Sequence, residues 1–271
     1  MLFLSEMPGC FFRLRPLVVQ APFGESSRKN WRANTVLEEV QESINWDPKR
    51  WVRNNANVPF FPPDLQKKVL VFPKASNNAA VFLNAEVQQP LTSVTVCLRY
   101  YTLLTRAYGL FSYATKQGDN DLLLYKLLPN QYRLYVGGSS VTFTLPEKPA
   151  SRPRWEHICM SWDSATGLVE LWVNGYPLPR MGLKKGYSIN PEASIVLGQD
   201  QNQGFLGWVF DINTSFQGEM TDVYMWDRVL SADEVNLVWN DHSVSNSLIN
   251  WSSLDYEIRN YVMIMPSLIS A

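Results

Sequence analysis

The stretch that decides the fold is HICMSWDS, residues 157–164, followed by GLVELWVNG, residues 167–175. In the first segment Ile158, Met160 and Trp162 alternate with smaller or polar residues, and this period of two predicts a β-strand. The second segment alternates in the same way, and its closing Asn174-Gly175 favours a hairpin turn. The sequence therefore predicts two strands joined by a short turn.

Two cysteines lie at the centres of predicted strands. Cys159 is in the stretch above, and Cys97 lies in the alternating run VTVCL, residues 94–98. Cys97 is the only plausible partner for Cys159 within the same domain, so we predict a disulfide that holds two parts of a β-sandwich together. It would close a loop of about sixty residues and contribute roughly 4 kcal/mol in the chain-entropy model. Such a bond indicates an oxidising compartment, and Cys10 is left over.

Short apolar segments continue before this stretch, separated by residues that favour turns. The expected strands are 69–72, 80–83, 94–101, 108–113, 122–125, 132–136 and 141–145. Many short strands with regular turns predict an all-β sandwich or barrel. A capping-box spacing predicts one helix after Ser231, with Glu234 at the third position and an apolar stripe behind it.

Composition excludes some classes of function. The chain has 24 basic and 25 acidic residues, and this balance argues against electrostatic binding of nucleic acid. No apolar run is long enough to cross a bilayer. The 10 tryptophans fit a β core built from bulky side chains better than a ligand platform.

The central stretch also fills every fixed position of the pattern His-x-Cys-x-Ser-Trp-x-Ser. Further blocks follow the same family order: VFP at 71–73, FSYAT at 111–115, LKKGY at 183–187, VLGQ at 196–199 and MWD at 225–227. On these residues the chain resembles the pentraxin family from about Asp64 onward. RAY at 106–108 and YEIRNYV at 256–262 most resemble the amyloid P branch of that family.

The resemblance implies an all-β, concanavalin-like jelly-roll sandwich of two antiparallel sheets. It places the short helix on one face, opposite a calcium face, and implies a return to strands at 248–251 and 256–264. We expect a pentraxin domain at 64–271. Residues 1–63 are expected to be a poorly ordered extension or a gene-model artefact rather than an interaction arm, with a short helix after Thr35 and a stiff Pro-rich linker at 58–63. The first residues contain no convincing signal peptide.

Two polar loops are candidate calcium sites, because calcium prefers carboxylate, amide and main-chain oxygens. Each alone is only a polar loop, and the resemblance supplies the roles. It implies two adjacent ions whose coordination a ligand phosphate or acidic sugar group completes. The corresponding residues are Asp119, Asn120, Asp200, Gln201 (through its main-chain carbonyl), Asn202, Asp211 and Thr214.

Three of these positions depart from the family pattern. Asp200 stands for a bridging Glu, Asn202 for a bridging Asp, and Thr214 for a Gln that binds the second ion. Each change shortens or neutralises a ligand, and calcium affinity follows ligand charge. We therefore expect the first ion to bind and the second to be weak or absent.

The resemblance also implies an apolar ligand pocket beside the calcium loops. Its residues are Leu123, Tyr125 and Tyr135, an arrangement similar to the amyloid P branch. Tyr135 fills the space that the C-reactive branch leaves for a trimethylammonium, and Ser140 lacks the acid of that branch. We expect phosphoethanolamine or an acidic sugar to bind better than phosphocholine. The alternative is that the two tyrosines only face each other across adjacent strands.

These features predict a secreted, calcium-dependent, lectin-like pattern-recognition protein that assembles into a cyclic oligomer, by expectation a pentamer. The alternative is a degenerate pentraxin module that acts through protein–protein contacts. An enzyme is not expected, because a glycosidase needs paired carboxylates and Asp163 and Glu170 have no evident partner. The sequons at Asn213 and Asn250 predict glycosylation, the first of them within the calcium loop. Occupancy at Asn250 is less expected, since Trp251 is predicted to lie in a strand.

Overall fold

The computed structural model describes residues 64–146, 154–202 and 210–268. They all belong to one compact unit, Phe61–Ala271. The predictions made for residues 1–63 (the extension, the helix after Thr35 and the Pro-rich linker) lie outside the described residues.

The first layer, sheet A, has the strand order β10-β9-β8-β3-β13-β1-β15, and β11 pairs with β9. Every pairing in it is antiparallel. Its strands are β1 (Lys68–Phe72), β3 (Ser93–Tyr101), β8 (Glu156–Asp163), β9 (Leu168–Val173), β10 (Tyr176–Pro177), β11 (Met181–Gly182), β13 (Gly218–Trp226) and β15 (Met263–Pro266).

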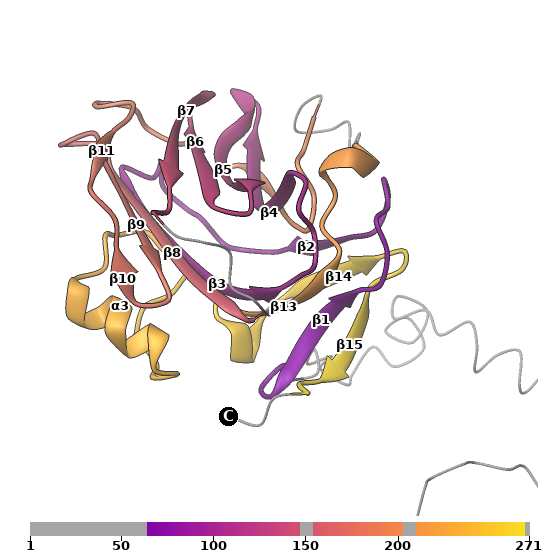
Figure 1. The fold of residues 1–271 in the computed structure, drawn as a ribbon. Coiled ribbons are helices and arrows are strands. Elements are labelled where there is room, and N and C mark those ends of the chain that lie inside the picture. The colour runs from indigo at the N-terminus through magenta and orange to yellow at the C-terminus, as the bar shows by residue number, and fades with distance from the viewer. Residues whose placement is uncertain (1–63, 147–153, 203–209, 269–271) are drawn as a thin grey trace, which may run out of the picture. The chain divides into compact units, whose positions relative to one another are not determined.

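The second layer, sheet B, has the order β14-β2-β12-β4-β5-β6-β7. These pairings are also antiparallel. Its strands are β2 (Ala80–Leu83), β4 (Tyr108–Thr115), β5 (Gly118–Leu128), β6 (Gln131–Val136), β7 (Ser139–Thr144), β12 (Ala193–Leu197) and β14 (Tyr256–Arg259). Figure 1 shows β4 to β7 facing β3, β8 and β9. The predicted two-sheet sandwich is confirmed.

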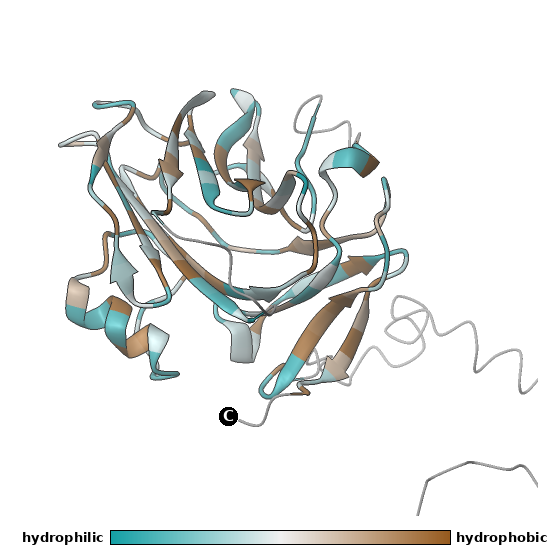
Figure 2. Ribbon diagram, in the orientation of Figure 1, coloured by the Kyte–Doolittle hydropathy of each residue, from teal (hydrophilic) through white to brown (hydrophobic). Residues whose placement is uncertain are grey.

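The central stretch forms the expected hairpin of β8 and β9. Trp162 on β8 is fully buried, and its indole N–H donates to the carbonyl of Leu183 at 2.9 Å. Asn174 and Gly175 both have positive φ, 51° and 80°, as a tight turn after β9 requires. Alternating side chains from both sheets fill the space between the layers, and Figure 2 shows hydrophobic and hydrophilic residues alternating along the strands.

One short helix, α3 (Ala232–Trp239), packs outside sheet A. Its capping box is confirmed, because Ser231 accepts from the Glu234 N–H and Glu234 accepts from the Ser231 N–H. Val235 and Val238 are buried, while Leu237 is exposed, and Figure 2 shows both hydrophilic and hydrophobic residues along the helix. In the described part of the chain, no helix is long and apolar enough to cross a membrane.

The predicted disulfide is confirmed, with Cys97 and Cys159 bonded. The two cysteines face each other directly on neighbouring strands β3 and β8. The bond therefore joins two strands of one sheet and does not cross between the layers. It lies under α3 in a buried cluster with Trp172, Trp226 and Val235.

One predicted strand is wrong. Residues 248–251 contribute only a single bridge, between Ile249 and Met225, before the 3₁₀ helix η2 (Trp251–Ser253) begins. Asn250 caps this turn by accepting from the Ser252 N–H, which interrupts a ladder. The Trp251 ring is buried and donates to the carbonyl of Leu65 at 3.0 Å, so its apolar character reflects core packing outside a strand.

Candidate calcium and ligand site

The candidate site lies on the outer face of sheet B, the face turned away from sheet A. Along β5, Leu122 and Leu124 belong to the core between the sheets. Because side chains alternate along a strand, Leu123 and Tyr125 face the other way. Tyr135 lies directly opposite Leu123 on β6. The structure thus brings together the three predicted pocket residues on one face.

The start of β5 carries the first two predicted calcium ligands, Asp119 and Asn120. The next residue, Asp121, is buried and anchors this strand end. Its carboxylate accepts from the hydroxyls of Thr115 and Tyr187, each at 2.7 Å. Asp121 is therefore satisfied by the protein itself, while Asp119 and Asn120 remain half-buried beside it.

The segment after β12 crosses the outer face of sheet B and carries Asp200. Its two flanking glutamines are almost fully buried, with 1% of Gln199 and 2% of Gln201 exposed. The amide of Gln199 donates to the carbonyls of Ser76 (2.8 Å) and Ala79 (2.7 Å). That of Gln201 donates to the carbonyl of Ser194 at 2.9 Å and to the hydroxyl of Ser112 at 3.1 Å. These bonds fix the backbone on both sides of Asp200.

Gly109 makes this crossing possible. A Cβ atom at this position on β4 would lie 2.7 Å from the carbonyl carbon and oxygen of Gln199. A side chain there would push the segment away from the sheet. The sequence pattern gave no sign of this contact, since it depends on the approach of two distant segments.

The most informative feature of the site is a set of buried oxygens that accept no hydrogen bond within the described part of the chain. They are Asn120 Oδ1, Asp200 Oδ1 and Gln201 Oε1, and they belong to three residues of the predicted calcium site. Gln199 Oε1 is in the same condition. Buried polar atoms normally have a partner, because leaving one unsatisfied costs about 1–3 kcal/mol. All four are acceptors, the kind of atom that a hard cation binds, whereas Arg106 Nη2 is a buried donor that also has no partner in the described part of the chain.

The charges of the site support the same interpretation. Burial, and then the charge of Asp119, raises the pKa of Asp200 to about 6. Burial, followed by the charges of Asp200 and Tyr135, raises the pKa of Tyr125 to about 12. Tyr125 therefore lies within electrostatic range of both Asp200 and Tyr135. A cation would relieve the repulsion between the two carboxylates.

The predicted ligands of the second ion are arranged differently. Asp211 is exposed, and its carboxylate caps the 3₁₀ helix η1 (Ile212–Thr214) by accepting from the N–H and the side-chain amide of Asn213, both at 2.9 Å. Thr214 donates its hydroxyl to the Asp211 carbonyl at 3.2 Å. The side-chain amide of Asn202 donates a long hydrogen bond to the Asp200 carbonyl, at 3.5 Å.

Asp119, Asp200 and Asp211 do not converge in the structure. Within the described ranges, three potential ligand atoms from His, Cys, Asp or Glu lie within 4.8 Å of one another only at Cys97, His157 and Cys159. The two sulfurs there form the disulfide, so neither is a thiolate and this group is not a metal centre. Asp119 and Asp200 interact electrostatically, and Asp211 does not form a group with them within this distance.

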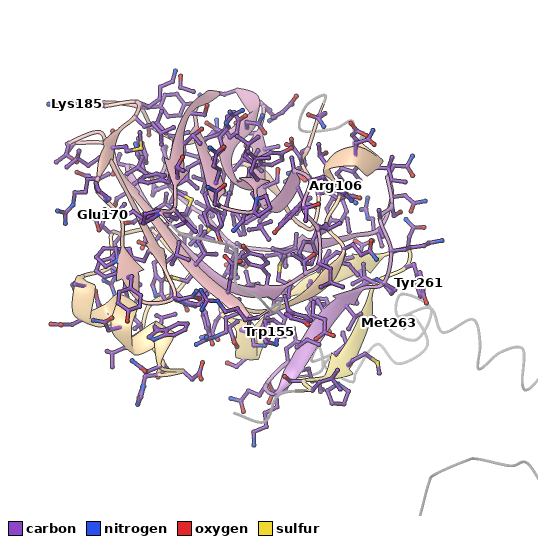
Figure 3. All side chains as sticks on the ribbon, in the orientation of Figure 1. Arg106, Trp155, Glu170, Lys185, Tyr261 and Met263 are labelled. Atoms are coloured by element: carbon purple, nitrogen blue, oxygen red, sulfur yellow. A yellow bond between two sulfur atoms is a disulfide. The ribbon has the colours of Figure 1, made fainter. Side chains whose placement is uncertain are left out.

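Arg106 was missed by sequence reasoning as part of the site. Its Nη1 donates to the carbonyls of Ala107 (2.9 Å), Asn213 (3.1 Å) and Ser215 (2.8 Å), which holds η1 against the start of β4. Figure 3 shows it beside η1. In the sequence, Arg106 belongs to the RAY block at 106–108, which indicated a family resemblance but gave no role for Arg106.

Comparison with known proteins identifies the family. A model described as the Pentaxin family matches residues 68–266. The chain is 47% identical over 207 residues to the serum amyloid P-component of Cavia porcellus, which covers 76% of this chain and 91% of that protein. It is 43% identical over 211 residues to the C-reactive protein of Homo sapiens, covering 77% and 92%. The chain belongs to the pentraxin family.

A solved pentraxin confirms the fold. The native heptameric SAP-like pentraxin from Limulus polyphemus matches with a TM-score of 0.65 and 23% identity, covering 76% of this chain and 98% of that one. At this identity the match speaks for the jelly-roll architecture alone. The predicted pentraxin family and fold are both confirmed.

Proposed function

We propose that this pentraxin is a calcium-dependent recognition protein, and that one ion binds at Asp119, Asn120, Asp200, Asn202 and the main chain of Gln201. The single observation that carries this proposal is a pair of buried side-chain oxygens without a hydrogen-bond partner, Asn120 Oδ1 and Asp200 Oδ1. Calcium takes six to eight oxygen ligands, so an ion bound at these residues would supply the missing partners. Bound calcium would supply a positive charge that attracts an anionic ligand group.

The second ion, at Asp211 and Thr214, is proposed to bind weakly or not at all. Asp211 already uses one oxygen to cap η1, and Thr214 reaches the Asp211 carbonyl in place of a metal. Each of these bonds competes with coordination. The site also has few carboxylates, because Asn202 replaces a bridging Asp and Asp200 is the one carboxylate left to bridge two ions.

The proposed ligand is phosphoethanolamine or an acidic sugar group, held beside the ion by Leu123, Tyr125 and Tyr135. Tyr135 lies directly opposite Ser140 on β7, so the group next to the phosphate would meet a bulky ring and a neutral hydroxyl. A trimethylammonium lacks both space and a counter-charge there. Phosphocholine is therefore the weaker ligand in this proposal.

The membership of the pentraxin family supports a proposal for assembly and location. A cyclic homo-oligomer, expected to be a pentamer, would present several weak sites in one direction and gain avidity. Secretion is supported by the Cys97–Cys159 disulfide. We propose no catalytic role: Glu170 pairs with Arg180, and Asp163 accepts from the Thr166 N–H and hydroxyl, so both carboxylates have local structural partners. The degenerate module remains the second candidate, favoured by the separate position of Asp211.

Calorimetric titration of the full chain with calcium tests the metal site. Asp200→Asn and Asn120→Leu are each expected to weaken the tight ion by about tenfold or more, since each removes an oxygen interaction with a full charge. Asp233→Asn on α3 is the matched control and is expected to leave calcium affinity unchanged. A tight ion unaffected by both site variants, or two tight ions per subunit, would contradict this assignment.

A further inference from the structure

Arg133 on β6 is a cation on the outer face of sheet B, because its neighbours Tyr132 and Leu134 belong to the core between the sheets. It is half-buried, and its Nε donates to the Thr142 hydroxyl at 3.2 Å. A guanidinium has several further N–H donors, and those of Arg133 make no hydrogen bond or ion pair with the described residues. Other arginines of the described ranges do pair with a carboxylate, among them Arg99, Arg180, Arg228 and Arg259.

Arg133 lies in line with the proposed calcium site across the strands of sheet B. Gly109 on β4 is directly opposite Tyr125 on β5, and Tyr125 is directly opposite Arg133 on β6. At the first end of this row the backbone of Asp200 crosses Gly109. Two strand spacings separate the backbones of Gly109 and Arg133, which is about 10 Å. Tyr125, a predicted pocket residue, therefore lies between the calcium segment and an arginine with donors to spare.

A second arginine acts on Tyr125 from the side of β4. Burial and then the charge of Asp200 raise the pKa of Tyr125, whereas Arg133 and Arg106 lower it, so both cations lie within electrostatic range of this ring. Arg106 is fixed by the three carbonyls that its Nη1 contacts, and its Nη2 is a buried donor without a partner. Neither arginine has a carboxylate partner within the described part of the chain. Positive charge left uncompensated beside a pocket favours an anionic group there.

We propose that the ligand of this site carries two anionic groups, one that completes the calcium coordination beside Asp200 and one that pairs with Arg133 across Tyr125. The inference rests on the proposed function, because the first group needs the bound ion. Within that function it selects a sugar with two acidic groups over phosphoethanolamine. A guanidinium holds a phosphate or carboxylate through two parallel N–H bonds, and Arg133 has the donors for them. The ammonium of phosphoethanolamine would meet a like charge instead.

Two matched sugars test the second contact. Fructose bisphosphate has a phosphate at each end, and fructose monophosphate lacks one of them. Each is titrated by calorimetry into the full chain at one fixed concentration of free calcium, and again with chelator in place of calcium. We expect the bisphosphate to bind about tenfold more tightly than the monophosphate, since it gains a hydrogen bond between charged groups. Chelator should abolish the binding of both sugars.

Substitutions at Arg133 locate this preference. Arg133→Gln keeps an N–H donor for Thr142 but removes the charge, so it is expected to bring the two sugars to within about twofold of each other. The same variant should bind phosphoethanolamine about twofold more tightly, because a repulsion is lost. A variant that is merely misfolded would not change the two ligands in opposite directions. Arg133→Lys should keep part of the preference. Arg259→Gln, which removes another arginine of sheet B, on β14, is the matched control and should leave the preference unchanged.

The outcomes separate this inference from the proposed function. Calcium-dependent binding of both sugars with equal affinity would overturn the inference and leave the calcium site standing, with Arg133 an ordinary solvated arginine. Equal losses of preference in Arg133→Gln and Arg259→Gln would indicate general charge attraction and would also overturn it. Bisphosphate binding that survives chelator would contradict the shared site. No binding of either sugar with calcium would overturn both proposals. If Arg133→Gln fails to fold, as judged by circular dichroism, Arg133→Lys decides in its place, and an unchanged preference in that variant would contradict pairing through the guanidinium.

Discussion

The outer faces of the two sheets are built on opposite principles. On sheet A, α3 covers the disulfide and Trp172, and the buried atoms without partners are ring nitrogens, His157 Nδ1 and Trp226 Nε1. On sheet B, the segment around Asp200 contacts Gly109 and Ser112 on β4, and the corresponding atoms are four oxygens and one nitrogen, Nη2 of the nearby Arg106. One face is closed by apolar packing. The other is closed by a polar segment, several of whose buried oxygens have no hydrogen-bond donor within the described residues.

The difference indicates separate roles for the two segments that lie over the sheets, α3 on sheet A and the segment around Asp200 on sheet B. A cover that only stabilises the fold can be apolar throughout, as Val235 and Val238 are on α3. The segment around Asp200 instead buries a carboxylate near Asp119, and burial, followed by the charge of Asp119, raises the pKa of Asp200. An arrangement that is costly without a ligand is expected where a ligand binds.

Removing the disulfide is the largest expected perturbation of sheet A. The double variant Cys97→Ala/Cys159→Ala opens a loop with a sequence separation of 62 and is expected to lower the free energy of unfolding by about 4 kcal/mol. Calcium affinity is expected to stay the same under conditions where the variant is folded, because the calcium residues are on the other sheet. Urea unfolding and calcium titration check the two statements separately. A parallel loss of calcium affinity would show that the faces are coupled.

The two faces are also expected to respond to pH with opposite signs. Burial, and then the charge of Arg99, lowers the pKa of His157 on sheet A to about 3. The unfolded histidine takes up its proton near pH 6.5, so stability falls as the pH drops below that value. Asp200 has a raised pKa of about 6, so without calcium the folded state takes up this proton first and stability rises as the pH falls through 6.

When calcium holds Asp200 in its charged form, the loss of stability caused by His157 at low pH should therefore be seen in full. From pH 7 to pH 5 we expect a loss of about 2 kcal/mol with calcium bound, and less than half of that in calcium-free buffer, where Asp200 opposes it. His157→Gln should remove most of the loss, and His242→Gln, at an exposed position, should not. Urea unfolding at both pH values checks this. Identical pH dependence with and without calcium would contradict the role given to Asp200.

A smaller effect is expected from the pocket on sheet B. The double variant Tyr135→Ala/Ser140→Glu opens space and adds an acid at two directly opposed positions. It should raise phosphocholine affinity by about tenfold, since a cationic group gains a charged partner. Competition between phosphocholine and phosphoethanolamine measures it, with Tyr135→Phe as the control that keeps the ring. An unchanged preference would mean that Tyr135 does not line the pocket.

The fold could be predicted well from the sequence, because the patterns that indicate its strands, turns and helix involve residues close together in the chain. Alternation in 157–164, the turn at Asn174-Gly175 and the capping box at Ser231 each depend on neighbouring residues. The strand predicted at 248–251 was wrong for a physical reason. Apolar residues there are buried by the fold, but Asn250 uses its side chain to cap η2 and ends the ladder.

The candidate site was predictable only in part. The resemblance named Asn120, Asp200 and Gln201, but residue patterns alone gave two polar loops. The approach at Gly109, the anchoring of Gln199 on Ser76 and the clamp of Arg106 on η1 join segments that are far apart in sequence.

The central claim is that the acceptor oxygens on the outer face of sheet B hold a calcium ion that a ligand completes. Calcium titration of the full chain by calorimetry, without and then with phosphoethanolamine, tests it most directly. The account predicts one tight ion whose affinity rises when phosphoethanolamine is present, because ligands that share a site must raise each other's affinity by the same factor. Calcium binding that is weak and indifferent to phosphoethanolamine would contradict the claim, and would favour the degenerate module instead.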